Sequence, residues 1–172
     1  DLFTHKEKDI ISLEGNPLPP ASYLLLDSLG NKWIGTSNSG IYFFNSEKEL
    51  QIFSVHSPKP FDIIDDHINM IFKDQGGSIW VLTKKGITRL GKYANEDFQI
   101  GKNTFSITEG QNGSIWVGTL GDGLLHKSAG SPDFKQFRGY PNYKLPKELV
   151  IHTIHADKNN QVWVGTYGKG IY

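Results

Sequence analysis

The 172-residue chain contains no cysteine, and its charges cancel, with 18 Lys and Arg against 18 Asp and Glu. Without cysteine there can be no disulfide, no thiolate metal site and no cysteine nucleophile. Without net positive charge there is no large basic surface to hold a phosphate backbone. Nucleic acid is therefore not expected as a partner through this region.

Long apolar runs and alanine are also scarce. The longest run of interest, Tyr23 to Leu26, stops at Asp27, whereas a membrane span needs about 18 or more apolar residues. Contact with a membrane is therefore expected only through segments outside this chain. Four alanines stand against 19 glycines, a balance that disfavours long helices and suits many tight turns. An all-β chain is expected.

All four tryptophans lie in copies of one short motif. The copies begin at Asp27, Asp74, Gly110 and Asp157 and read DSLGNKWIGT, DQGGSIWVLT, GQNGSIWVGT and DKNNQVWVGT. The tryptophans themselves, Trp33, Trp80, Trp116 and Trp163, are 47, 36 and 47 residues apart. Such spacings are typical of one supersecondary unit per repeat.

The motif predicts a tight hairpin turn before each tryptophan. Three residues before Trp stand the residue types that most easily accept positive φ, namely Gly30, Gly77, Gly113 and Asn160. The aspartate that opens three of the copies can accept backbone N–H bonds and close an Asx-type turn. Gly110 replaces it in the third copy, where we expect a looser turn.

Short segments rich in aromatic and β-branched residues surround each turn and predict antiparallel strands. Four strands per unit describe a β-propeller blade. We expect blades at 21–56, 67–100, 103–138 and 149–172, the last without its fourth strand, and a strand of a preceding blade at Asp1 to His5 followed by a linker to residue 20. Together they would form an open arc of a larger propeller.

In this fold the tryptophans are expected in the cores between neighbouring blades rather than as platforms for a ligand. Two residues after Trp, glycine at 35, 118 and 165 would let the adjacent strand approach closely. Leu82 occupies this position in the second copy, so the second blade must pack differently there.

The repeated pattern D-x-x-G-x-[IVLK]-W-[VI]-G-T-x-x-x-G-[IL], over roughly residues 20 to 172, resembles the two-component regulator propeller repeat. Such repeats form the periplasmic sensor region of hybrid two-component histidine kinases. The resemblance implies a periplasmic part of an inner-membrane protein that detects an extracellular cue, often a glycan breakdown product, and signals to a kinase. It implies no cofactor and no enzymatic activity for this region.

A ligand site can be placed only by blade geometry. The turn between the second and third strands lies at the same end of a blade as the linker to the next blade. Residues in those turns are weak candidates for binding an acidic or sulfated oligosaccharide: Lys84, Lys85, Asp122, Tyr167 and Lys169. The linkers at 62–67 and 142–147 are candidates as well, because long loops often carry function. Solvated turn residues are the alternative.

No catalytic or metal site is predicted. His152 and His155 fall on opposite faces of a strand, and the segment 65–67 suits a charged linker better than an acid/base pair. A propeller enzyme of the streptogramin-lyase type and a structural protein-interaction propeller remain alternatives. A homodimer is a further alternative, because open edge strands could be capped by a second copy.

Overall fold

The structure is a computed structural model that describes residues 12–13, 16–91 and 93–172. All regular structure in these residues is β-strand. The strand expected at Asp1 to His5 lies outside the described residues. In the described part of the chain, no helix is long and apolar enough to cross a membrane.

Four antiparallel sheets follow one another along the chain, and we call them blades 1 to 4. Blade 1 contains β3 (Ala21–Leu26), β4 (Lys32–Thr36), β5 (Ile41–Phe44) and β6 (Leu50–Phe53). Blade 2 contains β7 (Ile68–Lys73), β8 (Ile79–Thr83), β9 (Ile87–Leu90) and β10 (Glu96–Phe98). Blade 3 contains β11 (Thr104–Glu109), β12 (Ile115–Thr119), β13 (Leu124–Lys127) and β14 (Lys135–Phe137). Blade 4 has three strands, β17 (Ile151–Ala156), β18 (Val162–Thr166) and β19 (Gly170–Ile171).

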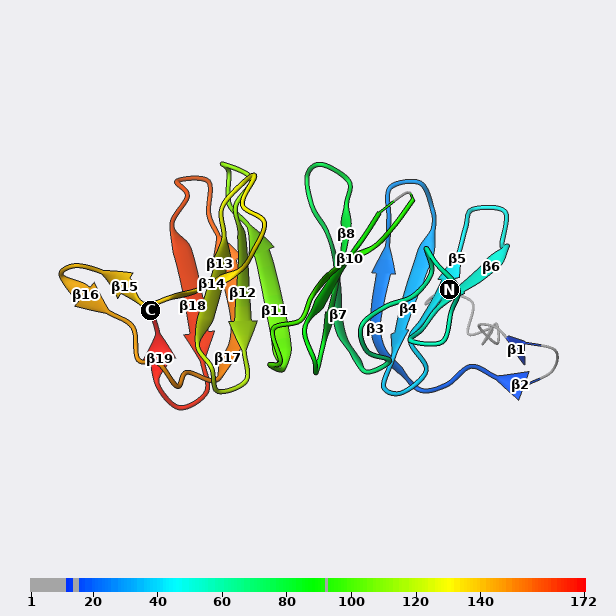
Figure 1. The fold of residues 1–172 in the computed structure, drawn as a ribbon, viewed down its shortest axis with the longest axis horizontal. Coiled ribbons are helices and arrows are strands. Elements are labelled where there is room, and N and C mark those ends of the chain that lie inside the picture. Colours follow the sequence, from blue (N-terminus) through cyan, green and yellow to red (C-terminus); the bar gives the residue numbers. More distant parts are fainter. Residues whose placement is uncertain (1–11, 14–15, 92) are drawn as a thin grey trace, which may run out of the picture.

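The blades stand side by side in an open row, with blade 1 at the right of Figure 1 and blade 4 at the left. Strands in each blade are ordered as in the sequence, and the first strands β3, β7, β11 and β17 lie next to one another. Two short hairpins flank the row, β1 (Ser12–Leu13) with β2 (Asn16–Pro17) and β15 (Gly139–Tyr140) with β16 (Tyr143–Lys144). The expected all-β propeller architecture is confirmed.

The hairpin turn between the first two strands has the predicted backbone in every blade. Gly30, Gly77, Gly113 and Asn160 all have positive φ, between 60° and 86°. Each donates its N–H to the carbonyl three residues earlier, at 2.9 to 3.0 Å. The third turn is not looser in this respect. There the Asn112 side chain accepts the Ser114 N–H at 3.1 Å, which replaces the missing aspartate.

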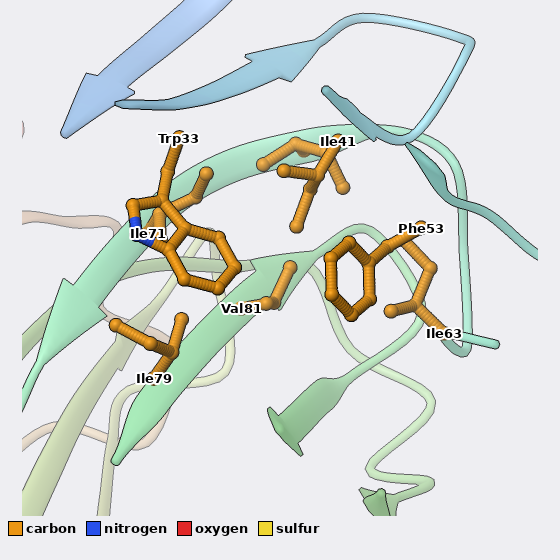
Figure 2. Packing of buried hydrophobic residues seen from close by; sticks show 8 residues of the cluster. Trp33, Ile41, Phe53, Ile63, Ile71, Ile79 and Val81 are labelled. Atoms are coloured by element: carbon orange, nitrogen blue, oxygen red, sulfur yellow. The ribbon is translucent and has the colours of Figure 1, made fainter. Parts of the chain in front are cut away.

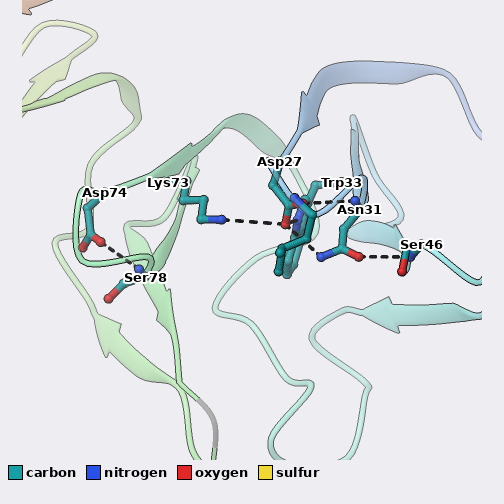
Figure 3. Close-up of polar contacts among 8 residues, drawn as sticks. Asp27, Asn31, Trp33, Ser46, Lys73, Asp74 and Ser78 are labelled. Atoms are coloured by element: carbon teal, nitrogen blue, oxygen red, sulfur yellow. Dashed lines mark hydrogen bonds and ion pairs between the residues drawn. The ribbon is translucent and has the colours of Figure 1, made fainter.

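The aspartate of the turn has a second role that the sequence did not predict. One of its oxygens accepts backbone N–H bonds, and the other accepts the indole Nε1–H of the tryptophan six residues later. The latter bond is 3.5 Å from Trp33 to Asp27, 2.8 Å from Trp80 to Asp74 and 3.2 Å from Trp163 to Asp157. Figure 3 shows the first of these turns. The hydrogen bond that the backbone N–H of Gln161 donates to the Asp157 carboxylate is the main cause that lowers the pKa of this carboxyl group.

A hydrophobic core lies between each blade and the next. Trp33 packs in the first core against Ile71, Ile79 and Val81 of blade 2 (Figure 2). Trp80 and Trp116 occupy the second and third cores, and all three indoles are at most 9 % exposed. The prediction that tryptophans lie in the cores between neighbouring blades is confirmed for these three. Trp163, in contrast, is 51 % exposed, because no described blade covers its face.

Small and large residues alternate across the junctions between blades. A Cβ added to Gly35 would lie 3.0 Å from the Cβ of Ile68, and one added to Gly118 would lie 2.9 Å from the Cβ of Ile151. Across the middle junction the sizes are reversed, because the equivalent positions hold Leu82 and Thr104, both fully buried. The smaller side chain of Thr104 therefore leaves room for Leu82 at the junction between blades 2 and 3.

A large residue paired with a small one, as in Leu82 and Thr104, should also fit the junction between blades 3 and 4. We expect Gly118→Leu to lower the free energy of unfolding by about 1–3 kcal/mol through overpacking against Ile151. Combined with Ile151→Thr, which copies the Leu82 and Thr104 pair, the loss should be smaller than the sum of the two single losses by about 1 kcal/mol. Urea unfolding of the four proteins measures this coupling. Strictly additive losses would contradict the junction described.

Candidate functional site

The turn between the second and third strands lies beside the linker that enters the next blade, as blade geometry predicts. Backbone bonds join the two directly, from Gly40 N to Asp66 O at 3.1 Å, from Gly101 N to Lys85 O at 2.9 Å and from Gly121 N to Leu149 O at 3.2 Å. We call this side of the blades the linker end. Rigid backbone therefore supports the predicted site residues.

At the linker end, two of the four predicted charged residues take part in ion pairs. The Lys85 Nζ lies 3.8 Å from the Asp65 Oδ1. Asp122 pairs with Lys102, while Lys84 and Lys169 are exposed. These residues are spread over three blades, and none of the five lines the groove between blades 3 and 4 that is described below.

Tyr167 is the predicted site residue with the most distinctive surroundings. It is 74 % exposed, and its ring lies 5.9 Å from the His152 ring, which in turn lies 5.5 Å from Phe105. The three rings form a row across blades 3 and 4 at the linker end. Such a row presents ring faces to solvent without enclosing a ligand.

The two carboxylates of the charged linker at 65–67 have different surroundings. Asp66 accepts the N–H of Val55 at 2.9 Å. The Oδ2 of Asp65 is buried and has no hydrogen-bond partner among the described residues, while its Oδ1 faces the Lys85 ammonium. Among the described residues, no cluster of three or more His, Cys, Asp or Glu could hold a metal ion.

A groove of about 620 Å³ lies elsewhere, between blades 3 and 4. One wall is aromatic: the rings of His126 and Phe137 lie 4.0 and 5.0 Å from that of Trp116. The β15–β16 hairpin adds Tyr140 and Tyr143, which are 66 % and 52 % exposed. A volume of this size falls in the range typical of small-molecule sites.

Polar side chains also line the groove. Asn112, Asn160 and Gln161, which belong to the hairpin turns of blades 3 and 4, contribute amides, and Ser114 contributes a hydroxyl. Amides and hydroxyls both donate and accept hydrogen bonds. Aromatic faces combined with such groups can hold a ring that carries hydroxyl groups.

Sequence reasoning found only part of this groove. The linker at 142–147 was singled out because of its length, and Tyr143 and Leu145 of that linker do line the groove. Trp116 was expected in a core between blades, and it does lie in the third core. The pattern Tyr140-Pro-Asn-Tyr143 was the available signal for an exposed aromatic hairpin.

Comparison with known proteins agrees with this fold. Residues 144–168 match the family model described as two component regulator propeller. No curated protein matches the chain in sequence. The solved structure of the extracellular domain described as that of a hybrid two component system from B. thetaiotaomicron is 24 % identical, with a TM-score of 0.69; the match covers 88 % of this chain and 19 % of that one.

Two further structures show the same blades in other settings. PorZ, a surface component of the type-IX secretion system of Porphyromonas gingivalis, is 17 % identical with a TM-score of 0.65, over 97 % of this chain and 27 % of PorZ. A virginiamycin B lyase from Staphylococcus aureus is 17 % identical with a TM-score of 0.62, over 91 % of this chain and 57 % of the lyase. The chain thus spans only a fraction of these proteins, and the similarity establishes the fold.

The half-buried histidine of the groove, His126, is expected to make stability depend on pH. Burial lowers the pKa of His126 below its ordinary value of 6.5. As the pH falls below that value, the unfolded chain takes up this proton before the folded chain does, so the folded state loses stability. We expect a lower melting midpoint at pH 5 than at pH 7.5, and a smaller difference in His126→Gln.

An exposed histidine provides the control. His56→Gln should leave the pH dependence of the midpoint as it is in the parent chain, because that side chain lies at the surface. An identical pH dependence in His126→Gln and in the parent chain would show that burial of this imidazole does not govern the effect.

Proposed function

We propose that the chain is part of the extracytoplasmic sensor region of a two-component system and that it recognises an oligosaccharide. The repeat at 144–168 and the similarity to an extracellular domain of a hybrid two component system support a sensor role. In the whole protein this region would be periplasmic and would signal to a histidine kinase. The chain itself would bind rather than catalyse.

The groove between blades 3 and 4 is the observation that carries the choice of ligand. Pyranose rings have apolar C–H faces that pack on aromatic rings, and hydroxyl groups that need donors and acceptors. Tyr140 and Tyr143 offer exposed ring faces, and Asn112, Asn160 and Gln161 add amides to the lining. Among the described residues, no Asp, Glu, Lys or Arg side chain lines the groove, so a neutral sugar fits it better than an acidic one.

The linker end is the second candidate for the ligand site. Its ring row of Phe105, His152 and Tyr167, beside the exposed lysines Lys84 and Lys169, would suit an acidic or sulfated sugar. It has less support because Lys85 and Asp122 are already paired and the ring row encloses no cavity. The two sites therefore differ in the charge of the sugar they favour.

An enzymatic role of the lyase type has weaker support. His126 and His152, two histidines that lie beside candidate sites, contact aromatic rings. Neither is hydrogen-bonded to a carboxylate in the described part of the chain. A propeller that only docks a protein partner is the remaining alternative, and a binding experiment separates it from the sensor.

The test is a thermal-shift measurement against neutral, acidic and sulfated oligosaccharides. A ligand that binds only the folded state at 100 times its Kd adds about 2.7 kcal/mol, which raises the midpoint of a chain of this size by roughly 5–10 °C. We expect such a shift with a neutral oligosaccharide. Tyr140→Ala and Tyr143→Ala should each weaken binding by about tenfold, through lost stacking of about 1.4 kcal/mol.

Tyr167→Ala is the matched control, because it removes an equally exposed tyrosine from the linker end. It should leave the neutral-sugar shift unchanged. A shift confined to acidic or sulfated sugars and lost in Tyr167→Ala would move the site to the linker end. No shift with any sugar would contradict oligosaccharide recognition and favour a propeller that docks a protein.

A further inference from the structure

Blade 2 carries an arginine where blades 1 and 3 carry a ring. The residue paired with the motif tryptophan on the third strand is Phe43 in blade 1, His126 in blade 3 and Arg89 in blade 2. Phe43 and His126 lie on their tryptophans with ring centroids 4.2 and 4.0 Å apart. The Arg89 guanidinium likewise lies over Trp80, 5.4 Å from the ring centroid. A cation therefore replaces a ring at the junction between blades 2 and 3.

Blade 3 carries a lysine at the next position of its third strand, and this lysine meets the same junction. The position holds Phe44 in blade 1 and Leu90 in blade 2, but Lys127 in blade 3. The Lys127 ammonium lies 5.8 Å from the ring centroid of Phe98 in blade 2. Because Phe98 stacks on Trp80 at 5.9 Å, cations from two blades lie on the two rings of one stacked pair.

Both cations line one cavity of about 160 Å³ between blades 2 and 3. Its lining also includes Trp80, Ile115 and the turn at 128–130. Like charges that share a cavity repel each other, so two departures from the repeat combine here into an arrangement that costs stability. An anion between the two cations would remove this repulsion and would accept charge-assisted hydrogen bonds.

The carboxylates near the cavity leave this role open. Asp74 lines the cavity, but its two oxygens accept the Ser78 N–H at 2.7 Å, drawn in Figure 3, and the Trp80 indole N–H at 2.8 Å. Glu96 lies 3.7 Å from the Arg89 guanidinium, with the two side chains 49 % and 44 % exposed, and ion pairs in such a setting are weak. Within the described residues, neither carboxylate forms an ion pair with the lysine.

Each cation is held in place and still has donors for a ligand. The Arg89 Nη2 donates to the Ser78 Oγ at 2.8 Å, and the Lys127 Nζ donates to the Ser131 carbonyl. A guanidinium has five N–H donors and an ammonium has three, so these bonds use only part of each group. Ordered cations with N–H groups to spare are what an oxyanion requires.

We propose that this cavity binds a single oxyanion group, a sulfate or a carboxylate, between Arg89 and Lys127. The guanidinium donates to the anion from blade 2, and the ammonium donates to it from blade 3. The site lies on the face of blade 3 opposite to the groove, because Ile115 and Lys127 alternate with Trp116 and His126 along β12 and β13. The proposal therefore holds whether or not the groove binds a neutral sugar.

An NMR titration of the indole N–H signals in the full chain tests the proposal, because Trp80 lines the cavity. The probes are sodium sulfate and glucose 6-sulfate at constant ionic strength, and glucose is the neutral control. We expect both sulfates to shift the Trp80 signal saturably and to leave the Trp33 signal in place. Tighter binding of glucose 6-sulfate would identify a sugar ester as the source of the group, and tighter binding of inorganic sulfate would identify the free ion.

Two variants remove one cation each. Arg89→Gln and Lys127→Leu should each weaken sulfate binding by about tenfold or more, through loss of a charge-assisted hydrogen bond. Lys127→Leu is the sharper variant, because it copies Leu90 of the preceding blade and should melt no lower than the parent chain. Lys127→Arg keeps the charge and should keep the binding.

Lys84→Gln is the matched control, since it removes an exposed lysine from the linker end of blade 2. It should bind sulfate as the parent chain does. A Trp80 signal that sulfate leaves unchanged, binding that survives in Lys127→Leu, or an equal loss in Lys84→Gln would each overturn the proposal.

Discussion

The contact between each tryptophan and the following blade is the interaction on which the rest of the structure depends. A single four-stranded sheet cannot bury both of its faces, and here the facing surfaces of neighbouring blades bury each other. The aspartate of the turn holds the indole edge, at 2.8 Å between Asp74 and Trp80, so the ring face is free to pack on the next blade. The groove lies between blades 3 and 4, beside Trp116 of the third junction.

The local elements and the role of the tryptophans were predictable from the sequence, because both depend on short-range chemistry. Gly30 and Asn160 adopt positive φ as their residue types suggest, and the burial of Trp33 follows from repetition of the motif. The bond from Asp to the Trp indole was within reach too, since both residues recur at a fixed spacing of six. The aspartate was expected to accept backbone N–H bonds only, and the bond from the indole to its second carboxylate oxygen was not expected.

The site was harder to predict, because it depends on residues from different repeats. The charges of Lys85 and Asp122 looked available in sequence, but Asp65 and Lys102 from neighbouring segments pair with them. The groove needs the hairpin at Tyr140 to stand away from the blades, and only the sheet geometry specifies that. The prediction of a looser third turn was wrong because Asn112 supplies the acceptor that Gly110 lacks.

Exchange of the four indole Nε1 protons with solvent, followed by NMR at a concentration where the chain is monomeric, tests the central claim most directly. Because Trp80 is 3 % exposed and bonded to a carboxylate while Trp163 is 51 % exposed, the account predicts the slowest exchange at Trp80 and the fastest at Trp163. Equal exchange at the two indoles would contradict the claim that each tryptophan is buried by the blade that follows it.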